Sequence, residues 1–241
     1  MRQSLGELYS TVRKAAVGRG VPHGIAEDLA DAVCWLDSLS LDGVSCAVDC
    51  LSQWPSNTSA IQLQHSESGL VLETAKPDTA ASALFAGPAL GDLLQAGAVP
   101  DTGSSLSVDV PLLVLAAVAQ TCDRLNRRAW LMIHLQGQIA IADCSQETCQ
   151  LGTVSQQKSV TAHKASEVTL WLSQPDQGRR TLNCLLSKEE FSRCRSRTLA
   201  EGLEVCGRSL KRLEAWAALT LVAESDRSRE SGAGAGLLDN D

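Results

Sequence analysis

The stretch that decides the fold is PLLVLAAVAQTCDRLN, residues 111–126, which is followed by RAWLMIHL and QIAIAD, residues 128–135 and 138–143. Proline at position 111 suits the first turn of a helix, where its missing N–H costs nothing. Apolar residues then recur at helical spacing to about Asn126. The next two segments are apolar and β-prone, and the Gln136-Gly137 dipeptide between them predicts a hairpin turn, although a poorer one than Asn-Gly.

Working outward toward the N-terminus, the sequence predicts three helices. Ser4 and Glu7 form a capping-box pattern before a helix over residues 4–17. A second helix is predicted over 24–38, and a third over 43–54 with Asp42 as its N-cap. These helices predict an N-terminal three-helix layer.

Shorter elements complete the expected fold. Strands are predicted over 69–73, 106–110 and 167–173, with 181–186 as the hairpin partner of the last, and a short helix over 89–95. A helix opens at Ser187, and a final one over 209–223 buries an apolar stripe that includes Trp216 against the sheet. The predicted class is α+β, with a mixed or antiparallel central sheet, a C-terminal helix and a Gly-rich tail. The expected parts are residues 1–55 (helical layer), 56–223 (α+β core) and 224–241 (tail).

Composition narrows the class of protein. The chain has 241 residues, 44% of them hydrophobic, which is enough to form a stable core without disulfides or bound metals. Its net charge is −7, with −9 in residues 1–123 and +2 in residues 124–241, and it has only one tyrosine and two phenylalanines. A nucleic-acid partner is therefore not expected. The longest apolar run, 110–119, is too short for a membrane span, and the N-terminus has no secretory signal pattern, so we expect a cytoplasmic protein with free thiols.

No residue cluster predicts a metal or a named catalytic site. The nine cysteines lack C-x-x-C spacing, so no zinc is expected, and those in apolar contexts, Cys34, Cys50, Cys184 and Cys206, are expected to be buried. The four histidines stand outside diagnostic motifs, and no G-x-S-x-G is present. The triplet Arg193, Arg195 and Arg197 is suited to an anion, but on a helix Arg195 points away from the other two, which favours a solvated face.

The C-terminal tail alternates glycine and alanine and ends in acidic residues. Its glycines lack the strand and helix that a phosphate-binding loop needs, so no cofactor is predicted there. Small alternating residues suit backbone that lies against another surface, which predicts a docking element. The predicted binding positions in this tail are Arg227, Arg229, Gly232, Gly234, Gly236, Asp239, Asn240 and Asp241.

Both ends of the chain resemble an uncharacterised family of bacterial proteins known by a domain of unknown function. The resemblance rests on Ser4-Leu5-x-Glu7-Leu8, on Gly24-Ile25-Ala26-Glu27 leading to Trp35-Leu36, and on the tail motif that closes with Asp239-Asn240-Asp241. It implies an architecture but no activity.

A fainter likeness exists to the type-two malate/lactate dehydrogenases, whose first helices run through an alanine-rich stripe into a Ser-His-Gly-Val segment. The corresponding stretch here is Leu41-Asp42-Gly43-Val44, with Asp42 in the place of the histidine. The hydride-transfer chemistry of that family is therefore not carried over.

Two hypotheses of function follow. The first is an auxiliary subunit that binds a partner protein or its own copy through the tail. The alternative is a small-molecule enzyme, a diverged relative of those dehydrogenases, with a site between the helical layer and the sheet that uses His23, Asp42 or an arginine.

Overall fold

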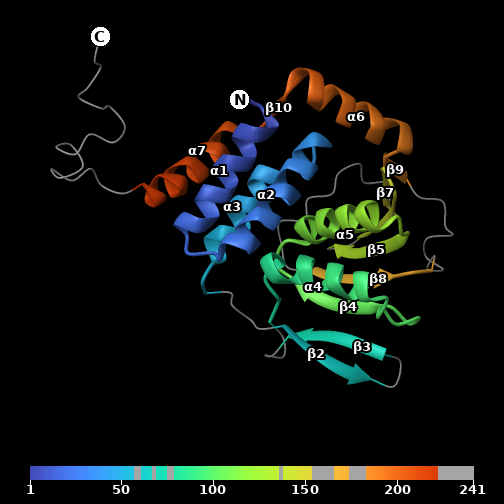
Figure 1. Ribbon diagram of the computed structural model, residues 1–241. Helices are drawn as coiled ribbons and strands as arrows, with labels where there is room; N and C mark the ends of the chain where they lie inside the picture. Colours follow the sequence, from blue (N-terminus) through green and yellow to red (C-terminus); the bar gives the residue numbers. More distant parts are fainter. Residues whose placement is uncertain are drawn as a thin grey trace, which may run out of the picture.

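The computed structural model describes residues 1–56, 61–66, 69–74, 79–135, 138–153, 166–173 and 183–221. Its order of elements confirms the predicted α+β class, with helices toward both ends of a sheet (Figure 1). The helices are α1 (Leu5–Gly18), α2 (His23–Ser38), α3 (Gly43–Gln53), α4 (Ala83–Ala96), α5 (Pro111–Leu125), α6 (Lys188–Glu201) and α7 (Gly207–Ala217), with a short 3-10 turn at Ala218–Thr220. The strands are β1 (Arg2–Gln3), β2 (Ile61–Ser66), β3 (Gly69–Thr74), β4 (Ser104–Val108), β5 (Ala129–Leu135), β6 (Gln138–Ser145), β7 (Thr148–Thr153), β8 (Ser166–Trp171), β9 (Asn183–Leu186) and β10 (Leu203–Glu204).

Six strands form the main sheet, in the order β4-β8-β5-β6-β7-β9, and all neighbours are antiparallel. The predicted helix over 111–126 is α5, and β5 pairs with β6 as the predicted hairpin, Leu131 opposite Ala142. The expected pairing of 181–186 with 167–173 is wrong. Strand β8 already has β4 and β5 on its two edges, so β9 pairs with β7 instead.

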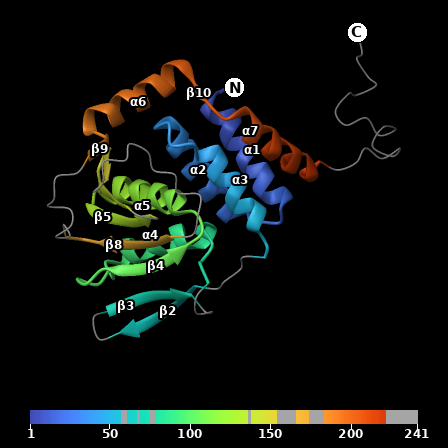
Figure 2. The same ribbon diagram turned by 180° about the vertical axis from the view of Figure 1, so that it is seen from behind.

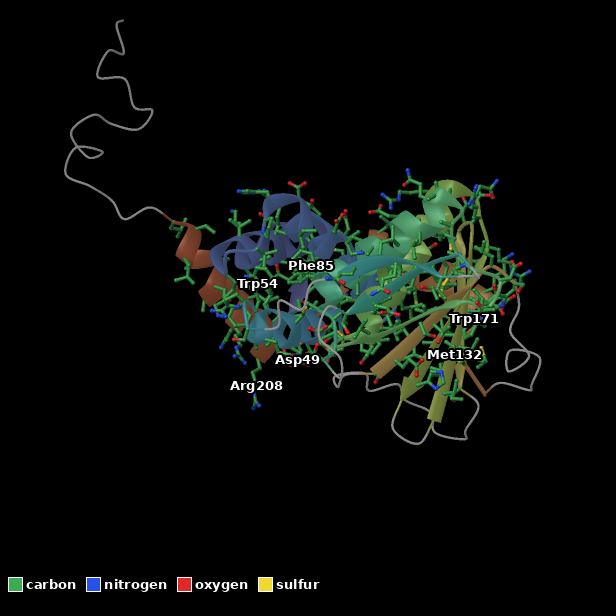
Figure 3. The ribbon with its side chains drawn as sticks, turned by 90° about the horizontal axis from the view of Figure 1, so that it is seen from below. Asp49, Trp54, Phe85, Met132, Trp171 and Arg208 are labelled. Carbon is green, nitrogen blue, oxygen red and sulfur yellow. The ribbon has the colours of Figure 1, made fainter. Side chains whose placement is uncertain are left out.

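One face of the sheet is covered by helices in two layers. Helix α5 packs on β5, β6 and β8, with α4 beside it, and α2 packs on α5 from the other side. Trp54 and Phe85, with ring centroids 5.7 Å apart, lie where the helical layer meets α4 (Figure 3). On the opposite face of the sheet a smaller cluster of Trp130, Met132 and Ile141 packs with the partly buried Trp171.

The helical layer is completed by elements from the other end of the chain. Helix α7 packs against α1 and α3, and β1 pairs with β10, so Gln3 lies opposite Leu203. The prediction that the last helix packs on the sheet is therefore wrong. Helix α6 crosses from the sheet to this layer, as both ribbon views show (Figure 1, Figure 2). The three-part division of the chain stays a prediction.

Trp216 is half-buried rather than enclosed. Two guanidinium groups lie over its ring. The Cζ of Arg19 is 5.4 Å and the Cζ of Arg212 is 5.0 Å from the ring centroid. Arg19 also donates to the carbonyl of Trp54 at 2.6 Å, which ties α1 to the end of α3.

We expect Trp216→Ala to lower the free energy of unfolding by about 2 kcal/mol, because it removes a half-buried ring and two cation–π contacts worth about 0.5–1 kcal/mol each. Urea unfolding measures this loss. The matched change Leu221→Ala, at a side chain that is 73% exposed, should stay within about 0.5 kcal/mol. A loss of about 4 kcal/mol for Trp216→Ala would show that the ring is fully enclosed.

Candidate functional site

The turn between α2 and α3 holds an unusual backbone. Ser40 has φ 59° and Asp42 has φ 51°, so two non-glycine residues within three positions are left-handed. A side chain makes this conformation costly, and residues held in it cluster at functional sites. The backbone conformation of this turn is therefore typical of a functional site.

A buried carboxylate from α2 holds this turn in place. Asp37 is only 8% exposed, and its two oxygens accept hydrogen bonds from the backbone N–H groups of Gly43 and Val44, each at 3.0 Å. The glycine at position 43 lets the start of α3 lie close to α2, because a Cβ there would lie 2.5 Å from the carbonyl oxygen of Val33. Asp37 thus caps the start of α3, and the predicted N-cap, Asp42, makes no side-chain cap.

The environment of Asp37 disfavours its charge. Burial, assisted by the negative charge of Asp42, raises the pKa of Asp37 to about 7, while the hydrogen bonds from Gly43 and Val44 oppose the rise. A carboxyl group whose pKa lies near neutrality is able to gain or lose a proton under ordinary conditions.

Asp37 lines a polar pocket of about 310 Å³. The pocket lies where α6 ends beside the C-terminal end of α2, close to the β1–β10 pair. Its charged and polar side chains come from three separate stretches of the chain: Arg2, Asp37, Ser40, Arg197, Thr198, Glu201 and Glu204. Chain reversal after α6 is made by Gly202, which has φ 79° and lies so close to Gln3 that a Cβ would approach its carbonyl oxygen to 2.8 Å.

Contacts from α6 connect the pocket to the left-handed turn. Thr198 donates through its hydroxyl to the carbonyl of Ser38 at 3.4 Å, and Arg197 donates to the hydroxyl of Ser40 at 3.4 Å. Arg2 pairs with Glu201 at 3.5 Å, but both side chains are more than half exposed, so this pair adds little stability.

A second helix N-terminus lies beside the turn. The hydroxyls of Ser45 on α3 and Ser209 on α7 are 2.9 Å apart. Hydrogen bonds lower the pKa of the exposed Cys206 thiol. They come from the backbone N–H and the hydroxyl of Ser209 and from the backbone N–H of Arg208, while the charge of Asp42 opposes them.

Cys34 and Cys50 are buried as predicted, but the predicted burial of Cys184 and Cys206 is wrong. Cys184 lies on the edge strand β9 and Cys206 directly precedes α7, so solvent reaches both side chains.

The sequence-predicted site residues are only partly brought together. The tail positions from Arg227 to Asp241 lie outside the described residues. His23 begins α2, so at 1.5 Å per residue it stands about 24 Å from the turn that holds Asp42. Arg197, which the sequence assigned to a solvated helix face, does line the pocket. Asp37 and Glu204 were missed, because nothing local marks a helix aspartate or a two-residue strand as part of a site.

The comparisons with known proteins give a family match and a fold. The family model described as "Protein of unknown function (DUF3726)" matches residues 3–66. No curated protein matches the sequence.

Solved structures with a similar fold include dehydrogenases and a reductase. A dehydrogenase from Sinorhizobium meliloti has a TM-score of 0.60 at 11% identity, covering 90% of this chain and 99% of its own. Sulfolactate dehydrogenase from Methanocaldococcus jannaschii has a TM-score of 0.59 at 8% identity, covering 90% of this chain and 96% of its own. A protein described as a malate/lactate dehydrogenase from E. coli has a TM-score of 0.58 at 8% identity, covering 96% of this chain and 98% of its own.

These matches correct the first hypothesis of function. The prediction of an auxiliary subunit that docks through its tail is wrong, because the chain has, over nearly its whole length, the fold of complete enzyme chains. Glycine–alanine alternation allows the backbone to lie close to another surface, but it does not specify a partner. The expected resemblance to a domain of unknown function is confirmed: residues 3–66 match DUF3726, and the chain as a whole has a malate/lactate dehydrogenase-like fold.

Proposed function

We propose that this chain is a small-molecule enzyme, a diverged relative of the malate/lactate dehydrogenases, which performs acid–base chemistry on a small carboxylate at the α2–α3 turn. The observation that carries the proposal is the turn itself. Two left-handed residues are held by the buried Asp37 beside a polar pocket. Strain of this kind persists only where the surrounding structure fixes it, as functional sites do.

The local sequence supports the same position. Residues 41–44 read Leu-Asp-Gly-Val where the type-two dehydrogenases have Ser-His-Gly-Val, so an aspartate stands in the place of their histidine. Aspartate and histidine both accept and donate protons, and each is used as a general base or acid. Asp42 is exposed, two residues beyond Ser40 of the pocket, and its charge reaches Asp37.

The carboxylate pair suits proton transfer. Asp37 is buried, and burial together with the charge of the exposed Asp42 raises its pKa. Neighbouring carboxyl groups in different environments are able to take the separate roles of acid and base. Arg197 supplies a guanidinium at the pocket, a group that pairs with a substrate carboxylate.

A hydride carrier does not fit this pocket. Hydride transfer in enzymes uses nicotinamide or flavin cofactors. At about 310 Å³ the pocket is at the lower end of ligand sites, and Glu201 and Glu204 would oppose the phosphates of a dinucleotide. We therefore assign no hydride-transfer step to these residues.

All nine cysteines are free thiols, which supports placing the enzyme in a reducing cytoplasm.

The test is proton exchange at the carbon next to a carboxylate. The full chain is incubated in D₂O with malate, lactate and amino acids, and NMR follows deuterium incorporation and product formation. We expect Asp42→Asn to lower the turnover about 10²- to 10⁴-fold, because it removes the proton acceptor. Asp101→Asn, in an exposed turn beyond α4, is the control and should keep full activity.

Thermal unfolding with the same compounds separates binding from chemistry. Asp42→Asn should retain the ligand-induced rise in Tm of the unaltered chain while it loses turnover. Oxidation of reduced nicotinamide dinucleotide by a 2-oxo acid, at equal rates in the unaltered chain and in Asp42→Asn, would overturn the acid–base assignment.

A further inference from the structure

The pocket beside the turn presents charges of both signs. Two arginines and three acidic residues line about 310 Å³, and they come from β1, α2, α6 and β10. Some of these charges already have partners within the protein, since Arg2 pairs with Glu201 and the oxygens of Asp37 accept from the α3 backbone. The pocket charges that have no charged partner among the described residues are those of Arg197 and Glu204.

Arg197 is free to hold an anion. Its side chain is exposed, and within the described part of the chain it forms no ion pair. Its one hydrogen bond there, to the hydroxyl of Ser40, is long at 3.4 Å. A guanidinium with unused donors pairs with a carboxylate through two parallel hydrogen bonds.

Glu204 provides the opposite charge at the same pocket. It lies on β10, directly opposite Arg2 in the strand pairing, yet the guanidinium of Arg2 pairs with Glu201 on α6. Within the described residues the carboxylate of Glu204 has no ion pair or hydrogen bond, so it is able to accept an ammonium group.

The geometry points to a zwitterionic ligand, a small amino carboxylate whose carboxylate pairs with Arg197 and whose ammonium pairs with Glu204. This inference rests on the proposed function and names its substrate class. A ligand that carries only a carboxylate would leave Glu204 without a partner beside the bound anion, and one that carries only an ammonium would do the same to Arg197. The pocket volume suits a molecule of amino-acid size.

The experiment compares matched ligands on the full chain by isothermal titration calorimetry. Alanine, serine, aspartate and glutamate are each paired with the hydroxy acid of the same skeleton, namely lactate, glycerate, malate and 2-hydroxyglutarate, and ethylamine replaces alanine without its carboxylate. We expect at least one amino acid to bind about tenfold or more tightly than its hydroxy acid, and ethylamine not to bind, because both charges take part.

Variants locate the contacts. Arg197→Gln and Glu204→Gln should each weaken binding of that amino acid about tenfold or more, a loss typical of removing one partner from a charge-assisted hydrogen bond. The control is Arg193→Gln, one turn earlier on α6 with an exposed side chain outside the pocket lining, which should leave the affinity unchanged. All three side chains are exposed, so the fold is expected to tolerate each change.

Failure of this inference differs from failure of the proposed function. The inference of a zwitterionic ligand would be wrong if hydroxy acids bound as tightly as the amino acids and Glu204→Gln had no effect, or if none of the compounds bound. It would also be wrong, while the proposed function held, if a hydroxy acid were turned over in a reaction that needs Asp42 but not Glu204. The opposite result would be amino-acid binding that needs both Arg197 and Glu204 but no turnover that depends on Asp42; it would support the inference and contradict the proposed function.

Discussion

Gly18→Ala is expected to destabilise the protein by about 3 kcal/mol or more, because the added methyl group would overlap the carbonyl oxygen of Trp216. Gly18 is the last residue of α1, and Trp216 lies near the end of α7, so the clash is between two packed helices. A backbone carbonyl has no rotamer to change. Relief therefore requires α7 to move away from α1, which loosens the packing of the helical layer.

Gly6→Ala is the matched control, since it makes the same substitution in the same helix. Among the described residues, no atom outside the helix's own backbone lies within 4 Å of a Cβ at Gly6, so the change adds only helix propensity, worth up to about 1 kcal/mol in favour of alanine. Urea unfolding of the two variants should thus give opposite signs. Equal effects would show that α7 is not docked against Gly18.

Asp37→Asn is expected to remove a pH-dependent loss of stability. The folded pKa of Asp37 is about 7, above the ordinary value of 3.8. Between these values the folded chain holds a proton that the unfolded chain has released, so the free energy of unfolding falls as pH rises from about 4 to about 7. At roughly 1.4 kcal/mol per pH unit, this loss amounts to about 2–3 kcal/mol between pH 5 and pH 8.

Urea unfolding at pH 5 and pH 8 measures the difference between the unaltered chain and Asp37→Asn. Asparagine cannot ionise, so the variant should lose less stability over this interval. It should also be less stable at pH 5, because its amide nitrogen faces an N–H donor at the start of α3. Burial also raises the pKa values of Asp28 and Asp31, but they contribute equally to both proteins and cancel in the comparison.

The exposed Asp101→Asn should keep the pH dependence of the unaltered chain. An Asp37→Asn protein with that same dependence would show that Asp37 is already ionised at pH 5. In that case the α3 cap, and not the cost of burial, would control the proton on Asp37.

Elements stabilised by neighbouring residues were determined by the sequence alone. The predicted capping box at Ser4 and Glu7 is formed, with the Glu7 N–H donating to the Ser4 hydroxyl at 3.2 Å. The helix that starts at Pro111 and the hairpin after it were also predicted, because apolar spacing and turn residues act over a few positions. Short-range signals of this kind are sufficient for the α+β class.

Contacts between distant residues were decided only by the tertiary structure. Asp42 reads as the N-cap of α3, yet its left-handed backbone leaves the cap to Asp37, five residues earlier on another helix. The partner of β9 depended on which sheet edges were already occupied, which no local pattern records.

The pocket shows the same limit most clearly. Arg2 and Glu204 face each other only because β1 and β10 pair across almost the whole described chain, and Arg197 joins them because α6 crosses from the sheet to the helical layer. Composition and spacing report the polarity of each residue and the period of its neighbours, so the sequence by itself determined helices such as α5 and the β5–β6 hairpin. Which charges meet depended on packing between segments far apart in the sequence.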